Sequence, residues 1–299
     1  ACLPGSKGLL QSMDGFPALV SDPWLNGRLT ALHACSDLWA CGARVSSAMA
    51  TVTLPMVSAE EQQELLVQTL AGIRSVLDEQ GAELIGGHTM ESRSAPPVPA
   101  SLGIQITLTV NGNSPKSPWL KTGLRPGDAL LISRPLGTGV LFAGTMTGAT
   151  KATDLDAALK GMACSQHVLL GQIEPIREGI HACTDITGFG LLGHLGEMLQ
   201  NSPGLTVELD GSAIPAYPGA LDLFKRGVSS TLAPSNRTAW RWLEGPVQLK
   251  QPPSAGLLEL LVDPQTCGPL LLACSPEAAT QLTRNGPWLQ IGNVTDVHG

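Results

Sequence analysis

The sequence predicts an α+β fold of the mixed α/β kind, arranged in two domains. Segments with helical periodicity and segments with strand-like alternation follow one another irregularly, which favours this class over an all-β fold. The chain has 299 residues, and because domains typically hold roughly 100–200 residues, two domains are expected. Hydrophobic residues make up 43% of the chain and charged residues 14%, which provides enough apolar side chain for a core and excludes a disordered protein.

The first predicted elements are the end of a strand and a capped helix. Gln11–Asp14 is expected to end a strand that stops at the acidic residue. Asp22 and Pro23 predict a helix start, with Asp22 as the N-cap, and Gly42 predicts the C-cap of the same helix. Apolar residues recur between them at helical spacing: Leu25, Leu29, Leu32, Cys35 and Trp39.

Asp37 falls in the last turns of this predicted helix. A carboxylate is unfavourable near a helix C-terminus because it faces the negative end of the helix macrodipole. A bound metal ion would compensate the charge, and a solvated surface aspartate is the alternative interpretation.

The remainder of the first half predicts strands on either side of a long helix. Val45–Leu54 predicts a strand, and a capping box that begins at Ser58 opens a helix that ends at Gly81. Ala82–Ile85 predicts a short strand, and the alternation of apolar and polar residues over 102–110 predicts a half-buried one.

A polar stretch with prolines, residues 111–118, is the best candidate for a linker. We therefore expect an N-terminal domain over residues 1–113 and a C-terminal α/β domain over residues 114–299.

The second half is expected to combine short strands with helices. The expected strands are Asp128–Ser133, His181–Thr184, Leu257–Val262 and Leu270–Cys274. A glycine loop, Arg134–Gly139, follows the first of them, and the second leads into Asp185. Residues 154–178 are expected to be helical, and Thr187 is expected to cap a glycine-rich helix over Gly188–Leu199.

Charge and hydropathy exclude several classes of protein. Lys and Arg number 18 and Asp and Glu number 25, so the formal charge is 18 − 25 = −7, and no basic cluster is present for nucleic acid. No apolar run approaches the ~18 residues that a membrane helix needs. No basic segment followed by an apolar core is visible at the N-terminus, so no signal peptide is expected.

Cysteine usage points to a reducing compartment. The chain has seven cysteines, an odd number, with no CxxC pair that would predict a zinc site. Most of them lie in apolar contexts, which is typical of reduced core thiols in a cytoplasmic protein.

Three acidic residues are candidates for metal binding. Asp14, Asp37 and Asp185 are each expected to close a strand or a helix beside small residues, and carboxylate oxygens are preferred ligands of Mg²⁺. Gly86–Thr89, with sequence GGHT, could direct backbone N–H groups at an anion, although a tight turn is the plainer interpretation. The P-loop and GxGxxG patterns are absent. The residues alone therefore predict an acidic α/β protein with a candidate magnesium–phosphate site.

Seven segments, taken together, resemble the selenophosphate synthetase (selenide, water dikinase) family. They occur in the order of that family and with nearly its spacing, and the TDITGFGLLGH and DPQT runs are highly specific. The segments are Met13–Phe16, Ser21–Trp24, His33–Gly42, Ile85–Thr89, Arg134–Gly139, Thr184–His194 and Asp263–Gly268. The stretch from Asp14 to Trp39 is most similar to the version fused to a flavin-dependent oxidoreductase.

The resemblance implies a two-domain fold like that of aminoimidazole ribonucleotide synthetase (PurM-like), with the N-terminal domain forming a homodimer. The implied reaction converts ATP, selenide and water into selenophosphate, AMP and phosphate, with Mg²⁺ as cofactor. By motif, Asp14 would contact ATP, and Asp37 would bind both ATP and Mg²⁺. Gly86, Gly87 and His88 would contact ATP, and Asp185 would bind Mg²⁺.

The family also has a glycine-rich arm with a Cys or selenocysteine and a Lys ahead of the position of Asp14. Only 13 residues precede Asp14 here, and Cys2 and Lys7 do not map onto that catalytic pair. No catalytic residue is therefore assigned, and the chain is expected to be a fragment. His33 stands where the family has Asn, and Cys267 stands where it has Ser.

Two alternative functions remain open at this point. The chain could be another ATP-using member of the same superfamily. It could also be a dimerisation or regulatory module that has kept the fold and lost the chemistry.

Overall fold

The computed structural model describes residues 8–92, 103–200 and 202–296, so Cys2 and Lys7 lie outside the described residues. The chain divides into two compact units. Unit 1 comprises the chain up to Pro118 together with Ser165–His167, and unit 2 comprises Trp119–Cys164 and the chain from Val168 onward. The mixed α/β class expected from the sequence is confirmed in both units.

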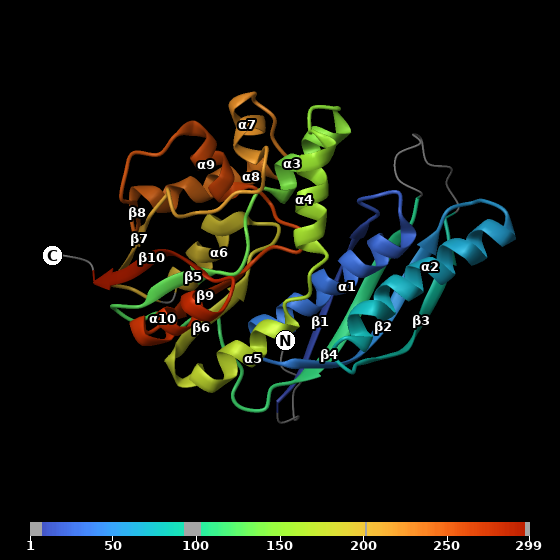
Figure 1. The fold of residues 1–299 in the computed structure, drawn as a ribbon, viewed down its shortest axis with the longest axis horizontal. Coiled ribbons are helices and arrows are strands. Elements are labelled where there is room, and N and C mark those ends of the chain that lie inside the picture. The colour runs from blue at the N-terminus through green and yellow to red at the C-terminus, as the bar shows by residue number, and fades with distance from the viewer. Residues whose placement is uncertain (1–7, 93–102, 201, 297–299) are drawn as a thin grey trace. The chain divides into compact units, whose positions relative to one another are not determined.

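Unit 1 is a four-stranded sheet with two long helices along one face (Figure 1). The strand order is β1-β4-β2-β3, in which β2 and β3 run parallel and the other neighbours run antiparallel. The elements are β1 (Leu9–Pro17), α1 (Pro23–Ala40), β2 (Arg44–Leu54), α2 (Ala59–Asp78), β3 (Glu83–Glu91) and β4 (Gln105–Asn113).

The helix ends of unit 1 follow the predicted capping residues. The Asp22 side chain accepts a hydrogen bond from the backbone N–H of Leu25, and α1 begins at Pro23. The C-cap of α1 is Cys41, one residue before the predicted Gly42, and Gly42 follows it with a φ of +68°, a conformation that favours glycine. Ser58 and Glu61 form the predicted reciprocal capping box at the start of α2.

Two glycines allow the backbones of α1 and α2 to come into direct contact where the helices cross. A Cβ on Gly27 of α1 would overlap the carbonyl oxygen of Thr69, and a Cβ on Gly72 of α2 would overlap that of Trp24. This crossing fixes α1 against its neighbour, and α1 is the helix that carries Asp37.

Two expectations about the strands of unit 1 are wrong. Asp14 does not end β1, because antiparallel pairing with β4 continues from Leu9 to Pro17. The GGHT segment is neither a tight turn nor a loop after a strand, because parallel pairing with β2 carries β3 through to Glu91.

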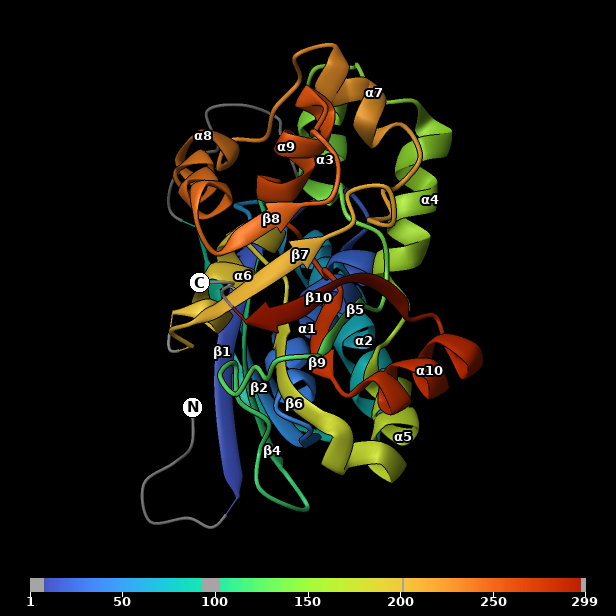
Figure 2. The ribbon, with the colours of Figure 1, turned by 90° about the vertical axis from the view of Figure 1, so that its left-hand side faces the viewer.

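Unit 2 contains a six-stranded sheet in the order β6-β9-β5-β10-β7-β8. Figure 2 shows β7 lying between β8 and β10. The strands are β5 (Ala129–Ile132), β6 (Ile180–Asp185), β7 (Leu205–Leu209), β8 (Val247–Leu249), β9 (Leu270–Cys274) and β10 (Leu289–Asp296).

The helices of unit 2 surround this sheet. Buried side chains of α3, α6, α7 and α9 pack with β5 and β9 in one apolar core, and α10 contacts β5 and β10. The helices are α3 (Thr138–Met146), α4 (Ala152–Met162), α5 (His167–Ile173), η1 (Glu174–Gly179), α6 (Gly190–Leu199), α7 (Ala220–Lys225), α8 (Ala233–Asn236), η2 (Arg237–Glu244), α9 (Ala255–Val262) and α10 (Pro276–Asn285).

Two expectations about unit 2 are also wrong. Leu257–Val262 was expected as a strand but lies in α9, where Ser254 caps the helix, because a short apolar run fits a buried helix as well as a strand. Thr187 does not cap α6, which begins at Gly190 without a side-chain cap. The Thr187 hydroxyl instead lies 3.2 Å from His194 Nε2.

In the described parts of the chain, no helix combines the length and apolarity that crossing a membrane requires.

Candidate functional site

In unit 1, β1 and α1 bring two carboxylates onto one surface. Ser12 and Asp14 are two residues apart in β1, so their side chains share the face that α1 covers. The Ser12 hydroxyl donates to Asp37 Oδ2 at 2.5 Å, and His33 Nε2 lies 3.2 Å from Asp14 Oδ2. Since His33 and Asp37 are one helical turn apart, these two contacts run side by side and place both half-buried carboxylates together.

The surroundings of Asp14 favour its ionised form. Burial by itself raises the pKa of Asp14, but the hydrogen bond and charge of His33 and the backbone N–H of Gly15 together lower it below 3.8. The Gly15 N–H lies 2.7 Å from Asp14 Oδ1. Asp14 is therefore a carboxylate at neutral pH.

We expect His33→Ala to raise the pKa of Asp14, because it removes two of the influences that lower the pKa and leaves Asp14 at a partly buried position. A carboxyl with a lowered pKa in the folded state adds stability above its ordinary value of 3.8, and this stability is lost as the pH falls through the lowered value. In the variant this contribution to stability is smaller, because the folded-state pKa of Asp14 moves back toward or above its ordinary value. NMR titration of the Asp14 carboxyl carbon measures the shift, with His88→Ala as a control. An unchanged Asp14 midpoint in His33→Ala would refute the interpretation.

The donor set fits a magnesium ion that is shared with a ligand. Asp14 and Asp37 offer hard carboxylate oxygens at a half-exposed position. Among the described residues, no cluster of three or more His, Cys, Asp or Glu forms a complete protein cage for a metal. Mg²⁺ characteristically binds through one or two carboxylates and completes its shell with water and substrate phosphates. Asp14 and Asp37 thus fit Mg²⁺ in company with a phosphate-bearing ligand.

The GGHT segment lies at the opposite edge of the same sheet. Asp14 pairs with Leu108, Leu108 with Ala50, and Ala50 with Gly87, so three strand spacings, about 14 Å, separate Asp14 from Gly87. A Cβ on Gly87 would overlap the carbonyl oxygen of Ala50, so this position requires glycine. Gly86, Gly87 and His88 are exposed. Within one copy of unit 1 they therefore do not join Asp14 and Asp37.

In unit 2, Asp185 is the last residue of β6, as expected, and its side chain is buried. It pairs with Leu270 of β9. The backbone N–H of Leu270 donates to the Ser133 hydroxyl at 2.8 Å, and the backbone N–H of Ser133 donates to the Leu270 carbonyl at 3.2 Å. The ends of β5 and β6 and the start of β9 thus meet at one edge of this sheet.

The DPQT segment closes over the glycine loop that begins α3. Gln265 Oε1 accepts the backbone N–H groups of Gly137 at 3.0 Å and of Thr138 at 3.2 Å. The Thr138 hydroxyl accepts the N–H of Thr266 at 3.0 Å. Burial raises the pKa of Asp263 to about 7, although bonds from Val140, Gln265 and Gly139 oppose the change. The DPQT segment and the glycine loop therefore hold each other in position in unit 2.

Sequence reasoning assigned no role to Ser12 or His33. Ser12 could have been found from its spacing, because a residue two before Asp14 in a strand shares its face. The contact of His33 with Asp14 depends on how α1 packs on the sheet, which no local pattern specifies.

Comparison with known proteins identifies the relatives of this chain. Residues 1–112 match the family described as AIR synthase related protein, N-terminal domain, and residues 125–299 match its C-terminal domain. The selenide, water dikinase of Nitratidesulfovibrio vulgaris is 34% identical over 301 residues, which cover 99% of this chain and 81% of the relative. That of Bdellovibrio bacteriovorus is 31% identical, over 92% of this chain and 75% of the relative.

A solved structure supports the fold. The thiamine-monophosphate kinase of Stenotrophomonas maltophilia is 18% identical and superposes with a TM-score of 0.67, over 97% of this chain and 84% of that chain. This likeness confirms the two-domain fold that the resemblance implied.

Proposed function

This chain belongs to the selenide, water dikinase family, and we propose that it carries out the reaction of that family, in which ATP, selenide and water give selenophosphate, AMP and phosphate. The structural observation that supports this proposal is the pair of contacts of Ser12 with Asp37 and of His33 with Asp14. These contacts fix two half-exposed carboxylates where they can bind a metal ion, in a protein whose formal charge is −7. Such a protein needs metal ions to accept a triphosphate.

Each residue of the proposed site has its own role in binding Mg²⁺ or ATP. Asp37 holds Mg²⁺ and faces the nucleotide, and Asp14 contacts ATP. Ser12 orients Asp37, and His33 keeps Asp14 ionised. Asp185 is the proposed metal ligand of unit 2. When bound, Mg²⁺ neutralises phosphate oxygens and supports phosphoryl transfer.

We also propose that unit 1 forms a homodimer through the open face of its sheet. Met13, Met49 and Met90 share that face by strand register and are 70%, 48% and 42% exposed. A twofold partner would bring β3 of the second copy toward β1 of the first, which would unite the GGHT segment with Asp14 in one ATP site. A monomer mass by light scattering would contradict this arrangement.

The location and the wider context of the protein follow from its cysteines and charge. The described cysteines form no disulfide, namely Cys35, Cys41, Cys164, Cys183, Cys267 and Cys274. Cysteines that stay reduced are typical of a reducing compartment, so we place the protein in the cytoplasm. A flavin-dependent oxidoreductase, fused or encoded upstream, remains a predicted partner, and neither nucleic acid nor a membrane is expected as one.

Selenide-dependent turnover of ATP tests the function. With Mg²⁺ and ATP, we expect AMP to form only when selenide is present under reducing conditions. Nucleotide products are separated by chromatography, and selenophosphate is identified by ³¹P NMR. Turnover to ADP without selenide would favour another kinase of the superfamily. Binding of Mg·ATP with no turnover would favour a module that has kept the fold without the chemistry.

A further inference from the structure

A cavity of about 340 Å³ lies in unit 2, with α6 on one side and α8 and η2 on the other. Phe189, Gly193, Glu197 and Gln200 line the α6 side. Each is three or four positions from the next, so together they form one face of the helix and its ends. The volume is at the lower end of the range for small-molecule sites in proteins, so the cavity fits a small ligand.

The η2 side of the cavity carries two side chains with unused donors. Arg241 and Trp242 both line it, and the guanidinium lies over the indole, 5.5 Å from the ring centroid. Within the described residues, no carboxylate forms an ion pair with Arg241, and the indole N–H of Trp242 donates no hydrogen bond. This wall therefore presents a positive charge and several uncommitted N–H groups.

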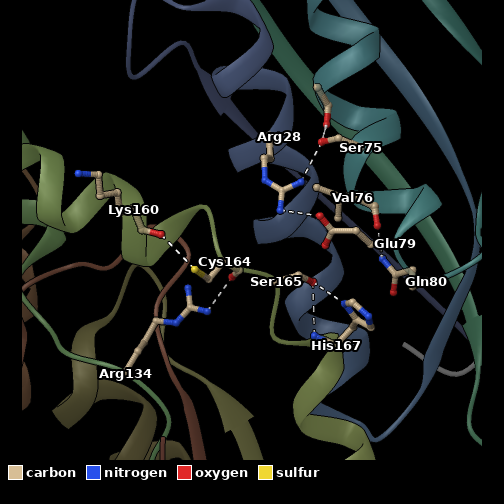
Figure 3. Close-up of polar contacts among 11 residues, drawn as sticks. Arg28, Ser75, Val76, Glu79, Gln80, Arg134, Lys160, Cys164, Ser165 and His167 are labelled. Carbon is tan, nitrogen blue, oxygen red and sulfur yellow. Dashed lines mark hydrogen bonds and ion pairs between the residues drawn. The ribbon is translucent and has the colours of Figure 1, made fainter.

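Arg28 of unit 1 shows how an arginine of this chain is bonded when protein partners surround it. Its guanidinium donates to Ser75 Oγ at 2.9 Å and to Glu79 Oε1 at 2.7 Å (Figure 3). Arg241 is exposed and has no such partners, which is common for an arginine on an open surface. Its position on the wall of a cavity, beside the free N–H of Trp242, is what points to a ligand.

The α6 side of the cavity carries the opposite charge, on Glu197. Lys121 Nζ lies 3.0 Å from Glu197 Oε2, and His194 Nδ1 lies 3.2 Å from the same oxygen. The contact with His194 and then that with Lys121 lower the pKa of Glu197 to about 2, although partial burial raises it. Glu197 is therefore a carboxylate at neutral pH. Its other oxygen, Oε1, has no hydrogen-bond partner among the described residues.

Glycines and aromatic rings give the cavity its space and its apolar surface. A Cβ on Gly196 would overlap the Trp242 indole, and a Cβ on Gly193 would overlap the Phe189 Cβ. Both aromatic residues therefore lie directly on the backbone of α6. Phe189 is 60% exposed, so its ring offers apolar surface that no other part of the described chain covers.

We propose that this cavity binds an α-amino acid with an aromatic or large apolar side chain. Arg241 and the Trp242 N–H receive the carboxylate of the ligand, and Glu197 Oε1 receives its ammonium group. The rings of Phe189 and Trp242 pack against its side chain. A ligand with only one charge would leave the opposite charge of the cavity without a partner, which is why a zwitterion fits. The proposal goes beyond the proposed function and does not rest on it.

Calorimetric titration of L-phenylalanine, L-methionine and L-leucine into the full chain, without ATP or selenide, tests the site. We expect saturable binding of at least one of them. Two derivatives of the amino acid that binds test the need for both charges, because its amide lacks the carboxylate and its N-acetyl form lacks the ammonium group. Each derivative should bind at least about tenfold more weakly. No saturable binding of any of the three, or derivatives that bind as well as the amino acid, would overturn the proposal.

Two variants assign the charges of the ligand to the walls of the cavity. Arg241→Gln should weaken the amino acid by about tenfold without weakening its amide further, and Glu197→Gln should do the same without weakening the N-acetyl form further. Arg284→Gln is the matched control, because exposed Arg284 in α10 also lacks a carboxylate partner in the described structure and does not line the cavity.

The pattern of losses separates binding from a merely structural role. If Arg241 only supported the local fold, Arg241→Gln would weaken the amino acid and its amide alike, and this result would overturn the assignment. Wild-type affinity for the amino acid in either variant would do so as well. Because Arg241 is exposed, Arg241→Gln should keep the fold, which circular dichroism checks.

Discussion

Asp37→Ala is expected to lower the affinity for Mg·ATP by at least about 100-fold. The substitution removes a carboxylate that holds Mg²⁺ in the proposed site, and even residues that only orient metal ligands change metal affinity by 10–100-fold. It also leaves the Ser12 hydroxyl without the oxygen to which it donates at 2.5 Å. Calorimetric titration of Mg·ATP into the purified chain measures the loss, and ATP titrated without Mg²⁺ provides the baseline.

The control for Asp37→Ala is Asp222→Ala, which removes the same charge from an exposed position in α7. It should bind Mg·ATP like the wild type. Ser12→Ala should show a smaller loss than Asp37→Ala, because Ser12 orients the carboxylate and does not supply it. An affinity of Asp37→Ala for Mg·ATP equal to that of the wild type would show that Mg·ATP does not bind at Asp37 of α1.

Gly72→Ala is expected to destabilise unit 1 by about 2–3 kcal/mol, as overpacking typically does. The added methyl would overlap the carbonyl oxygen of Trp24, which belongs to the backbone of α1 and cannot move aside like a side chain. Helix propensity alone would favour alanine by ~1 kcal/mol, so the expected sign is opposite to that of an unhindered site. Urea unfolding followed by circular dichroism measures the change.

Gly171→Ala is the matched control for Gly72→Ala. Gly171 also lies in a helix, α5, but a Cβ there would meet no atom within 4 Å, so alanine should be neutral or stabilising. If Gly72→Ala were as stable as Gly171→Ala, the direct contact between the backbones of α1 and α2 would be refuted. Because α1 carries His33 and Asp37, Gly72→Ala should also weaken Mg·ATP binding, which Gly171→Ala should not do.

Local signals in the sequence specified much of unit 1. The Asp22 cap and the capping box at Ser58 depend on a few neighbouring residues, and both predictions are confirmed. The C-cap of α1 is Cys41, one residue before the predicted Gly42, which follows it in a left-handed conformation. The placement of Asp37 in the last turn of α1 followed from the same signals.

Predictions failed where distant partners decide the structure. β3 extends through the GGHT segment because β2 pairs with it, which local residue preferences do not reveal. Leu257–Val262 is a helix because a capped apolar run of this length is compatible with either state until its packing is known.

The site was predictable as a set of residues but not as an arrangement. The resemblance named Asp14, Asp37 and the GGHT segment without their distances. The partners Ser12 and His33 depend on the packing of α1 against β1. The separation of Asp14 from Gly87 across the sheet depends on strand order, which the sequence pattern leaves open.

The strand order of unit 2 also determines when its strands can pair while the chain is being synthesised on the ribosome. β5 leaves the ribosome first among the strands of its sheet, yet both of its neighbours, β9 and β10, are the last two strands of the chain. Unit 1, in contrast, has all of its strands once Asn113 has been made. Vectorial folding can therefore finish unit 1 early. The apolar ALLI segment of β5, which ends at Ile132, has no strand partner until β9 begins at Leu270, nearly half the chain later, and chaperone binding is most valuable during that period.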